Sequence, residues 1–250
     1  MIRAERRGRV SVLTLEHGKA NAFDLELCRG VVSVLDEMIR DGASAVVITG
    51  TGKIFSAGVD LFRVLDGGRD YVAEFLPALD DAMAAVVGFP KPLVAAVNGH
   101  AIAGGCVVAC ACDHRVAAAG GGRIGVPELA VGVPFPTLAF ELVRGGAPRA
   151  VRDLIFNART VEMEEARELG VVDRLVDGDD LLDAACEAAE RLARLPREAF
   201  ALTKRQLWEP GLARRRTVGA EWDAEVLEQW CSEAAHERIR DYLEKAIGRS

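Results

Sequence analysis

The sequence predicts an α/β protein with parallel strand pairing and a helical C-terminal region. Short apolar runs that are typical of buried strands alternate with amphipathic runs that are typical of helices up to residue 176. After Asp179 the strand-like runs stop, and the chain continues as helix upon helix. Half of the 250 residues are apolar and 28% are charged, so the chain can bury a sizeable core.

The strand-like and helix-like runs follow one another in a regular order. The run RVSVLTL, the first expected strand, alternates apolar and polar residues. Strands are expected at residues 9–15, 45–49, 93–97, 114–118 and 171–176, and helices at residues 24–40, 70–87, 104–112, 136–144 and 162–169. Asp24 is placed to cap the first helix. The buried face of that helix is expected to hold Leu25, Val31, Val32, Leu35 and Ile39.

The last third of the sequence predicts a helical layer. In the run from Ala220 to Gly248, the residues Trp222, Val226 and Trp230 recur every four positions. This spacing places large apolar side chains on one face of a helix. We expect the layer to cover the core or a partner subunit.

Charge and composition exclude several classes of protein. The formal net charge of −7 argues against nucleic acid as a general partner, because a phosphate backbone needs a cationic surface. No stretch approaches the ~20 uninterrupted apolar residues of a membrane span. The charged N-terminal sequence MIRAERRGRV does not resemble a secretion signal. Six scattered cysteines are typical of reduced thiols, so we expect a cytoplasmic protein.

Two patterns resemble nucleotide and metal sites but lack the geometry that such sites need. The segment GGGRIG at 120–125 matches the spacing G-x-G-x-x-G, yet Pro127 follows at once and prevents the helix that this motif requires. The segment 106–114 contains three cysteines and one histidine. On a helix the first two cysteines share a face and the third points elsewhere, so apolar packing is favoured and no metal is expected.

Three glycine-containing segments follow three consecutive predicted strands. They read KIFSAGVDL at 53–61, AAVNGHAIAGGC at 95–106 and RIGVPELAVGVP at 123–134. Loops that leave parallel strands at the same end of a sheet converge, so these segments are expected to form one site. Glycine in such loops allows the backbone to come close to a ligand.

A combination of motifs along the chain is recognisable. They are KANAFD at 19–24, SAGVDL at 56–61, NGHAIAGGC at 98–106 and CDHRVA at 112–117. Together they resemble the enoyl-CoA hydratase/isomerase family, also called the crotonase superfamily. The resemblance covers most of the chain and implies a spiral of β-β-α units with a helical C-terminal region. It also implies acyl-CoA thioesters as substrates, no further cofactor, and a homotrimer or a dimer of trimers.

The resemblance implies a division of the chain into two parts. Residues 1–195 are expected to form a spiral α/β core domain that carries the acyl-CoA site. Residues 196–250 are expected to form a helical region that covers the core and makes the trimer contacts.

The family motif also implies roles for particular residues. Its reactions pass through an enolate, and the backbone N–H groups of Val59 and Gly104 occupy the positions that stabilise the thioester oxygen. Loss of one such donor typically costs ~2.7–4 kcal/mol. A hydratase of the family uses two glutamates, and their positions here are Val107 and Glu128. We expect apolar surroundings to raise the pKa of Glu128.

A single carboxylate can carry a proton between two carbons, whereas adding water normally needs a second group. The sequence therefore favours an isomerase that converts 3-enoyl-CoA to 2-enoyl-CoA, with Glu128 as the proton carrier. The alternatives are an enoyl-CoA hydratase, another reaction of the family, and an acyl-CoA-binding protein without turnover. Phe135, Pro136 and Leu138 are expected to reshape the acyl pocket. Glu141 is expected on the helix surface or in an ion pair, with a role as second acid as the alternative.

The resemblance finally implies where the coenzyme lies. The expected binding residues are Lys19, Ala20, Ala22, Ala57, Gly58, Asp60, Leu61, Gly105 and Val107. Lys53 and Arg63 are the candidate partners of the phosphates, and Lys245 is a weaker candidate that would act on a neighbouring subunit. The segment 62–77 is expected to be a flexible flap over the acyl chain.

Overall fold

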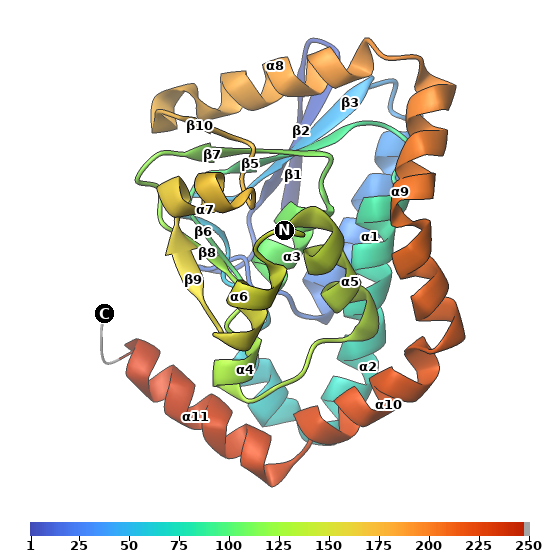
Figure 1. Ribbon diagram of the computed structural model, residues 1–250. Helices are drawn as coiled ribbons and strands as arrows, with labels where there is room; N and C mark the ends of the chain where they lie inside the picture. The colour runs from blue at the N-terminus through green and yellow to red at the C-terminus, as the bar shows by residue number, and fades with distance from the viewer. Residues whose placement is uncertain (248–250) are drawn as a thin grey trace.

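A spiral of β-β-α turns forms the centre of the fold in a computed structural model (Figure 1). The structure describes residues 1–247. Each turn contributes one strand to a large sheet, one short strand to a small sheet, and one helix. The turns are β3 (Ala45–Thr49), β4 (Ile54–Ser56) and α2 (Leu61–Gly88); β5 (Leu93–Val97), β6 (His100–Ile102) and α3 (Gly104–Ala111); β7 (His114–Ala118), β8 (Arg123–Gly125) and α4 (Glu128–Val131). The predicted α/β class and spiral are confirmed.

The large sheet has the order β1-β2-β3-β5-β7-β10, with β1 (Ile2–Arg7), β2 (Val10–Leu15) and β10 (Arg174–Val176). Only β1 is antiparallel to its neighbour, and the remaining pairs are parallel. Strands β3 and β5 are buried along their whole length, because helices cover both faces of the sheet. The expected last strand is shorter than predicted, since Val171 and Val172 pack in the core before β10 begins.

The small sheet has the order β4-β6-β8-β9, with β9 at Thr160–Glu162. Its first three strands are parallel and lie inside the three segments that the sequence indicates as loops. Each of them is three residues long. A run of three residues is too short to show an alternating pattern, so the sequence gives no strand signal there.

The remaining helices surround the two sheets. They are α1 (Leu25–Arg40), α5 (Thr137–Gly146), α6 (Val151–Phe156), α7 (Met163–Leu169), the short 3-10 helix Gly178–Asp180, α8 (Leu181–Ala193), α9 (Arg197–Thr217), α10 (Gly219–Trp230) and α11 (Glu233–Ile247). Asp24 caps α1 as predicted, and its carboxylate accepts a hydrogen bond from the Leu27 amide at 2.8 Å. The predicted position of Ile39 is wrong, because Met38 takes the buried position and Ile39 is exposed.

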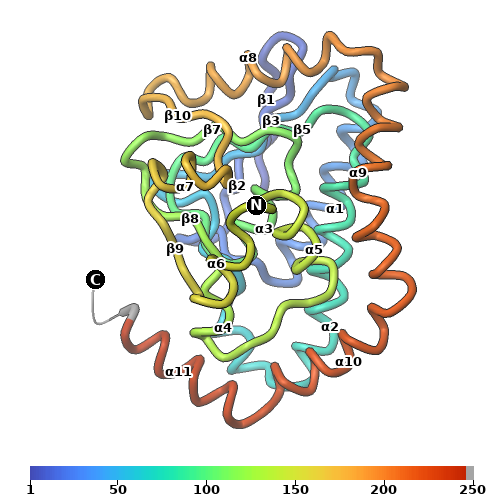
Figure 2. The backbone as a smooth tube through the Cα atoms, in the orientation of Figure 1, coloured from blue at the N-terminus to red at the C-terminus, as the bar shows by residue number. Residues whose placement is uncertain are grey.

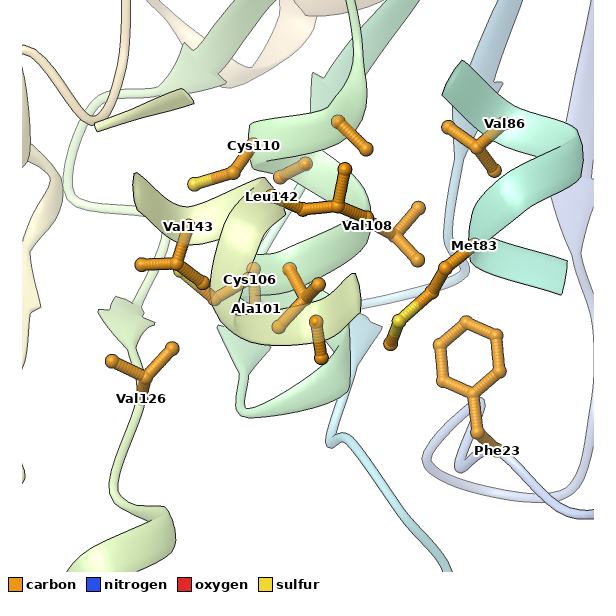
Figure 3. Close-up of a cluster of buried hydrophobic side chains, with 14 of the residues drawn as sticks. Phe23, Met83, Val86, Ala101, Cys106, Val108, Cys110, Val126, Leu142 and Val143 are labelled. Carbon is orange, nitrogen blue, oxygen red and sulfur yellow. The ribbon is translucent and has the colours of Figure 1, made fainter. Parts of the chain in front are cut away.

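The apolar core is divided by the large sheet. On one face, the strands pack against the alanine-rich side of α8. On the other face, a larger cluster joins α1, α2, α3 and α5. Figure 3 shows Cys106 and Cys110 of α3 among apolar side chains that include Leu142 and Val143 of α5. The cysteines are free thiols in apolar packing, as the sequence favours.

The last three helices wrap around the rest of the molecule as an arc (Figure 2). Val226 and Trp230 of α10 are buried as predicted, but Trp222 is 55% exposed. Trp222 lies in the first turn of α10, and the helix packs on the core only further along the same face, at Val226 and Trp230. None of the described helices is both long and apolar enough to cross a membrane.

The expected flap at 62–77 is helical. Asp60 caps α2 by accepting hydrogen bonds from the amides of Phe62 and Arg63, both at 3.1 Å. Val64 and Val72 bury the inner face of this stretch. Gly68, with φ +55°, interrupts the helical backbone and produces a kink. The helix predicted from residue 70 therefore begins earlier, at Leu61, because the cap and the buried valines outweigh the two glycines.

Candidate active site

The loops after β4 and β6 meet at two glycines. A Cβ atom on Gly58 would lie 2.7 Å from the Ala103 Cβ atom and 3.3 Å from the Gly104 nitrogen. Gly58 also has φ +89°, which L side chains rarely adopt. Gly105 packs still more tightly, since its Cβ would lie 2.5 Å from the Ser56 carbonyl oxygen. Glycine is required at both positions because two backbones approach each other here.

The turn into α3 presents the Gly104 amide at the start of a helix. Ala103 has φ +51°, a strained conformation for a residue with a Cβ atom. Its amide donates to the Gly125 carbonyl at 2.8 Å, and its carbonyl accepts from the Val107 amide at 3.0 Å. These two hydrogen bonds hold the turn in place. The positive end of the α3 dipole therefore lies at Gly104.

One apolar cavity brings together the residues for which the sequence predicts a catalytic role. Val59, Gly104 and Glu128 all line it, with Val107 beside them. The amides of Val59 and Gly104 donate no hydrogen bond within residues 1–247. Both amides are therefore free to donate a hydrogen bond to a bound oxygen.

Glu128 is the first residue of the short helix α4 and is 9% exposed. Its Oε2 atom is buried and has no hydrogen-bond partner among the described residues. Burial raises the pKa of Glu128 to about 8, against a smaller opposing effect of its own backbone amide. The raised pKa predicted from the sequence agrees in direction and cause. A carboxyl group of this kind can exchange a proton near neutral pH.

The cavity offers little other acid–base chemistry. Within the described chain, Glu128 is the one carboxylate that lines it. Val107 is 1% exposed and contributes only methyl groups to the wall. Trp230 also lines the wall, but its indole N–H already donates to the Pro134 carbonyl at 2.9 Å.

A second, more open groove adjoins the cavity and shares Ala57, Val59 and Leu61 with it. Most of the predicted coenzyme-binding residues line this adjoining groove, namely Lys19, Ala20, Ala22, Ala57, Asp60, Leu61 and Arg63. Arg63 is half-exposed and pairs with Glu26 at 3.1 Å, and these contacts raise its pKa. His17 lines the same groove and contacts the Asp24 carboxylate at 2.6 Å.

Several predicted residues lie outside both hollows. Lys53 is exposed and does not line either one. Phe135 and Pro136 line the cavity, but Leu138 is buried in the core instead. Glu141 is 3% exposed, so the predicted surface position is wrong. Its predicted ion pair is confirmed, because the Arg214 guanidinium lies 3.0 Å from its carboxylate and Arg144 also contacts it.

The sequence reasoning missed the part of the wall that comes from the last helix. Tyr242 of α11 lines both the cavity and the adjoining groove. Ala235 and Ile239 are buried on the same helix at positions i−7 and i−3 from it. This helical spacing is visible in the sequence and predicts that Tyr242 faces inward. It does not reveal which surface the helix covers.

Comparison with known proteins identifies similar chains. The sequence model of the enoyl-CoA hydratase/isomerase family matches residues 5–247. A curated relative from Thermus thermophilus, named "Putative enoyl-CoA hydratase", is 36% identical over 212 residues, which are 83% of this chain and 83% of the relative. The structure of the enoyl-CoA hydratase EchA3 from Mycobacterium ulcerans is 29% identical with a TM-score of 0.82, covering 90% of this chain and 98% of that one. Human mitochondrial Δ3-Δ2-enoyl-CoA isomerase has the same fold, with a TM-score of 0.93, 24% identity and coverage of 100% and 99%.

Proposed function

Because the chain belongs to the enoyl-CoA hydratase/isomerase family, we propose that it moves a double bond of an enoyl-CoA thioester from position 3 to position 2. The observation that carries the proposal is the single carboxylate of the cavity. Glu128 is the one carboxylate among the described residues that line the cavity. Val107 also lines it and cannot carry a proton, although the resemblance to the family implies the second glutamate of a hydratase at its position.

The reaction follows from the placement of these groups. Ionised Glu128 takes a proton from the α carbon of the thioester, and the electron pair moves toward the carbonyl to form an enolate conjugated with the original double bond. The backbone N–H groups of Val59 and Gly104 donate hydrogen bonds to the enolate oxygen. Glu128 then returns its proton to the γ carbon, which leaves the double bond conjugated with the thioester. No water is consumed and no other reactant is needed.

The adjoining groove suits the coenzyme portion of the substrate. Asp60 and Leu61 line it close to the cavity, and Lys19 and Arg63 place two cationic side chains along it. Cations of this kind favour phosphate groups. We assign the apolar cavity to the acyl chain and the groove to the coenzyme. The oligomeric state is proposed to be the homotrimer or dimer of trimers that the sequence predicts, and light scattering would test it.

The substitution Glu128→Gln tests the proposed role of the carboxylate. It keeps the size of the side chain but removes its ability to carry a proton, so we expect kcat on trans-3-enoyl-CoA to fall by about 10²–10⁴-fold. The measurement is the appearance of the conjugated thioester absorbance. The matched control is Glu221→Gln, the same change on an exposed residue of α10. Retention of most of the activity by Glu128→Gln would contradict the mechanism.

Hydration of 2-enoyl-CoA is the second candidate, because the relative from Thermus thermophilus bears the name of a hydratase. Incubation with trans-2-enoyl-CoA distinguishes the two reactions. Isomerisation of the 3-enoyl substrate creates conjugation, whereas hydration of the 2-enoyl substrate removes it. Tight binding of both thioesters without either change would instead support an acyl-CoA-binding protein.

A further inference from the structure

The wall between the cavity and the adjoining groove contains a tyrosine from the end of the chain. Tyr242 lies on α11, which passes beneath α4, the helix that begins with Glu128 (Figure 1). Buried Ile239 anchors α11 to the core, and the carbon stem of Arg238 packs over Gly132 at the end of α4. The position of Tyr242 is therefore fixed relative to Glu128 by contacts on both sides.

Two polar side chains line this cavity, and the carboxylate lacks a partner. The Oε2 atom of Glu128 is buried without a hydrogen bond among the described residues, and the half-buried Tyr242 lines the same cavity. A phenol is neutral over the whole neutral pH range and can donate a hydrogen bond to a carboxylate. The cavity thus contains an unpartnered acceptor and, on another part of its wall, a phenol that can donate to it.

We propose that Tyr242 is a positioning residue for Glu128, whose ionised carboxylate accepts a hydrogen bond from the Tyr242 hydroxyl during turnover. The inference rests on the proposed function, because it concerns the same carboxylate. Donation to the ionised form stabilises that form and fixes the direction from which the carboxylate meets the substrate. The last helix of the chain thereby takes part in the site without contacting the reacting carbons.

The Cys106 thiol and the α2 side chains near Glu128 do not compete with Tyr242 as donors to its carboxylate. Burial and the charge of Glu128 raise the pKa of Tyr242, which indicates that the phenol and the carboxylate affect each other. The Cys106 thiol of α3 lies near the same charge. Its interaction with Cys110, its burial and the charge of Glu128 all raise its pKa, so this thiol stays protonated. Helix α2 contributes Leu79 and Met83 to the cavity, which carry no charge.

The chain has only two tyrosines, which permits a direct test without any assay of activity. Tyrosine labelled with ¹³C at Cζ gives two resonances, and Tyr71→Phe assigns them. We expect the Tyr242 resonance to show a titration step near pH 8, the pKa of Glu128, and we expect Glu128→Gln to abolish it. Tyr71 is the internal control, since its hydroxyl is buried without a partner among the described residues and the residue does not line the cavity. Absence of the step, or its persistence in Glu128→Gln, would overturn the inference.

Kinetics provide the second test. Tyr242→Phe removes only the hydroxyl, so the pKa of Glu128 rises further and the acid limb of the kcat/KM profile moves to higher pH by about one unit. The corresponding loss of kcat at pH 7 is about tenfold, with little change in KM. Tyr71→Phe should leave the profile where it is. An unshifted limb in Tyr242→Phe counts against the positioning role.

The two tests separate this inference from the proposed function. A Tyr242 titration step in a protein that does not isomerise 3-enoyl-CoA would reject the proposed reaction and keep the contact between phenol and carboxylate. Isomerisation without the step and with an unshifted pH profile would reject the role of Tyr242 alone.

Discussion

At the scale of single residues, the burial of Glu128 has opposite consequences for chemistry and stability. The carboxyl group lies in an apolar cavity to which the described residues contribute no cation, and burial raises its pKa to about 8. A base of this strength removes a weakly acidic proton more readily than an exposed glutamate would. Ionisation of Glu128 destabilises the folded state, because it leaves a charge in surroundings that do not solvate it.

The stability of the protein should therefore depend on pH through Glu128. The pKa of its carboxyl group in the folded state lies above the ordinary value of 4.5, so its contribution to the free energy of unfolding is fully present below pH 4.5 and is lost as the pH rises to about 8. Glu128→Gln removes this loss, so we expect the free energy of unfolding of the variant to exceed that of the wild type by at most about 5 kcal/mol at pH 9. Urea unfolding at pH 5 and pH 9 measures this difference. Equal differences at both pH values would contradict the prediction, and Glu221→Gln serves as the exposed control.

At the scale of elements, the short strands of the small sheet determine where the loops meet. The sequence predicts the centre of the large sheet, because β3 and β5 are continuous apolar runs, but it misses the edge strand β1. It also predicts convergence of the three glycine segments. It does not predict β4, β6 and β8, whose register depends on pairing between distant segments rather than on any local pattern. The residues that the three glycine segments contribute to the candidate site were therefore predictable, whereas the distances between these segments were not.

The contact between α3 and β4 gives a test at this scale. A Cβ atom on Gly105 would lie 2.5 Å from the Ser56 carbonyl oxygen, so Gly105→Ala must move the start of α3 away from β4. Because a displacement of ~1 Å can lower the rate about 10²-fold, we expect a loss of kcat of that order on 3-enoyl-CoA. Gly178→Ala is the control, since a Cβ atom there meets open space. A Gly105→Ala enzyme with unchanged kcat would show that the position of α3 does not matter.

At the scale of the whole molecule, residues of the helical arc and of the spiral core line one cavity. The sequence periodicity of the last helices shows which face is buried, as Val226 and Trp230 illustrate, but not the surface that the face meets. The structure shows that α10 and α11 complete the cavity through Trp230 and Tyr242. Loss of contact between the arc and the core would therefore lower activity as well as stability.

One buried ion pair ties the arc to the core. Lys204 of α9 is 5% exposed, and its ammonium group lies 2.9 Å from the Asp113 carboxylate between α3 and β7. The same carboxylate oxygen accepts a hydrogen bond from the Leu93 amide at the start of β5. Burial raises the pKa of Asp113 even with Lys204 opposing it. Removal of the ammonium would leave this carboxylate buried without its cation.

We expect Lys204→Met to lower the free energy of unfolding at pH 7 by about 3–5 kcal/mol, since it breaks one partner out of a buried pair. Urea unfolding measures the change, and Arg205→Met, the same kind of substitution on an exposed neighbour, should stay within about 0.5 kcal/mol. The double variant with Asp113→Asn should recover part of the loss, because no charge then remains unpaired. If Lys204→Met costs no more than Arg205→Met, the ion pair between Lys204 and Asp113 contributes nothing to holding the arc on the core.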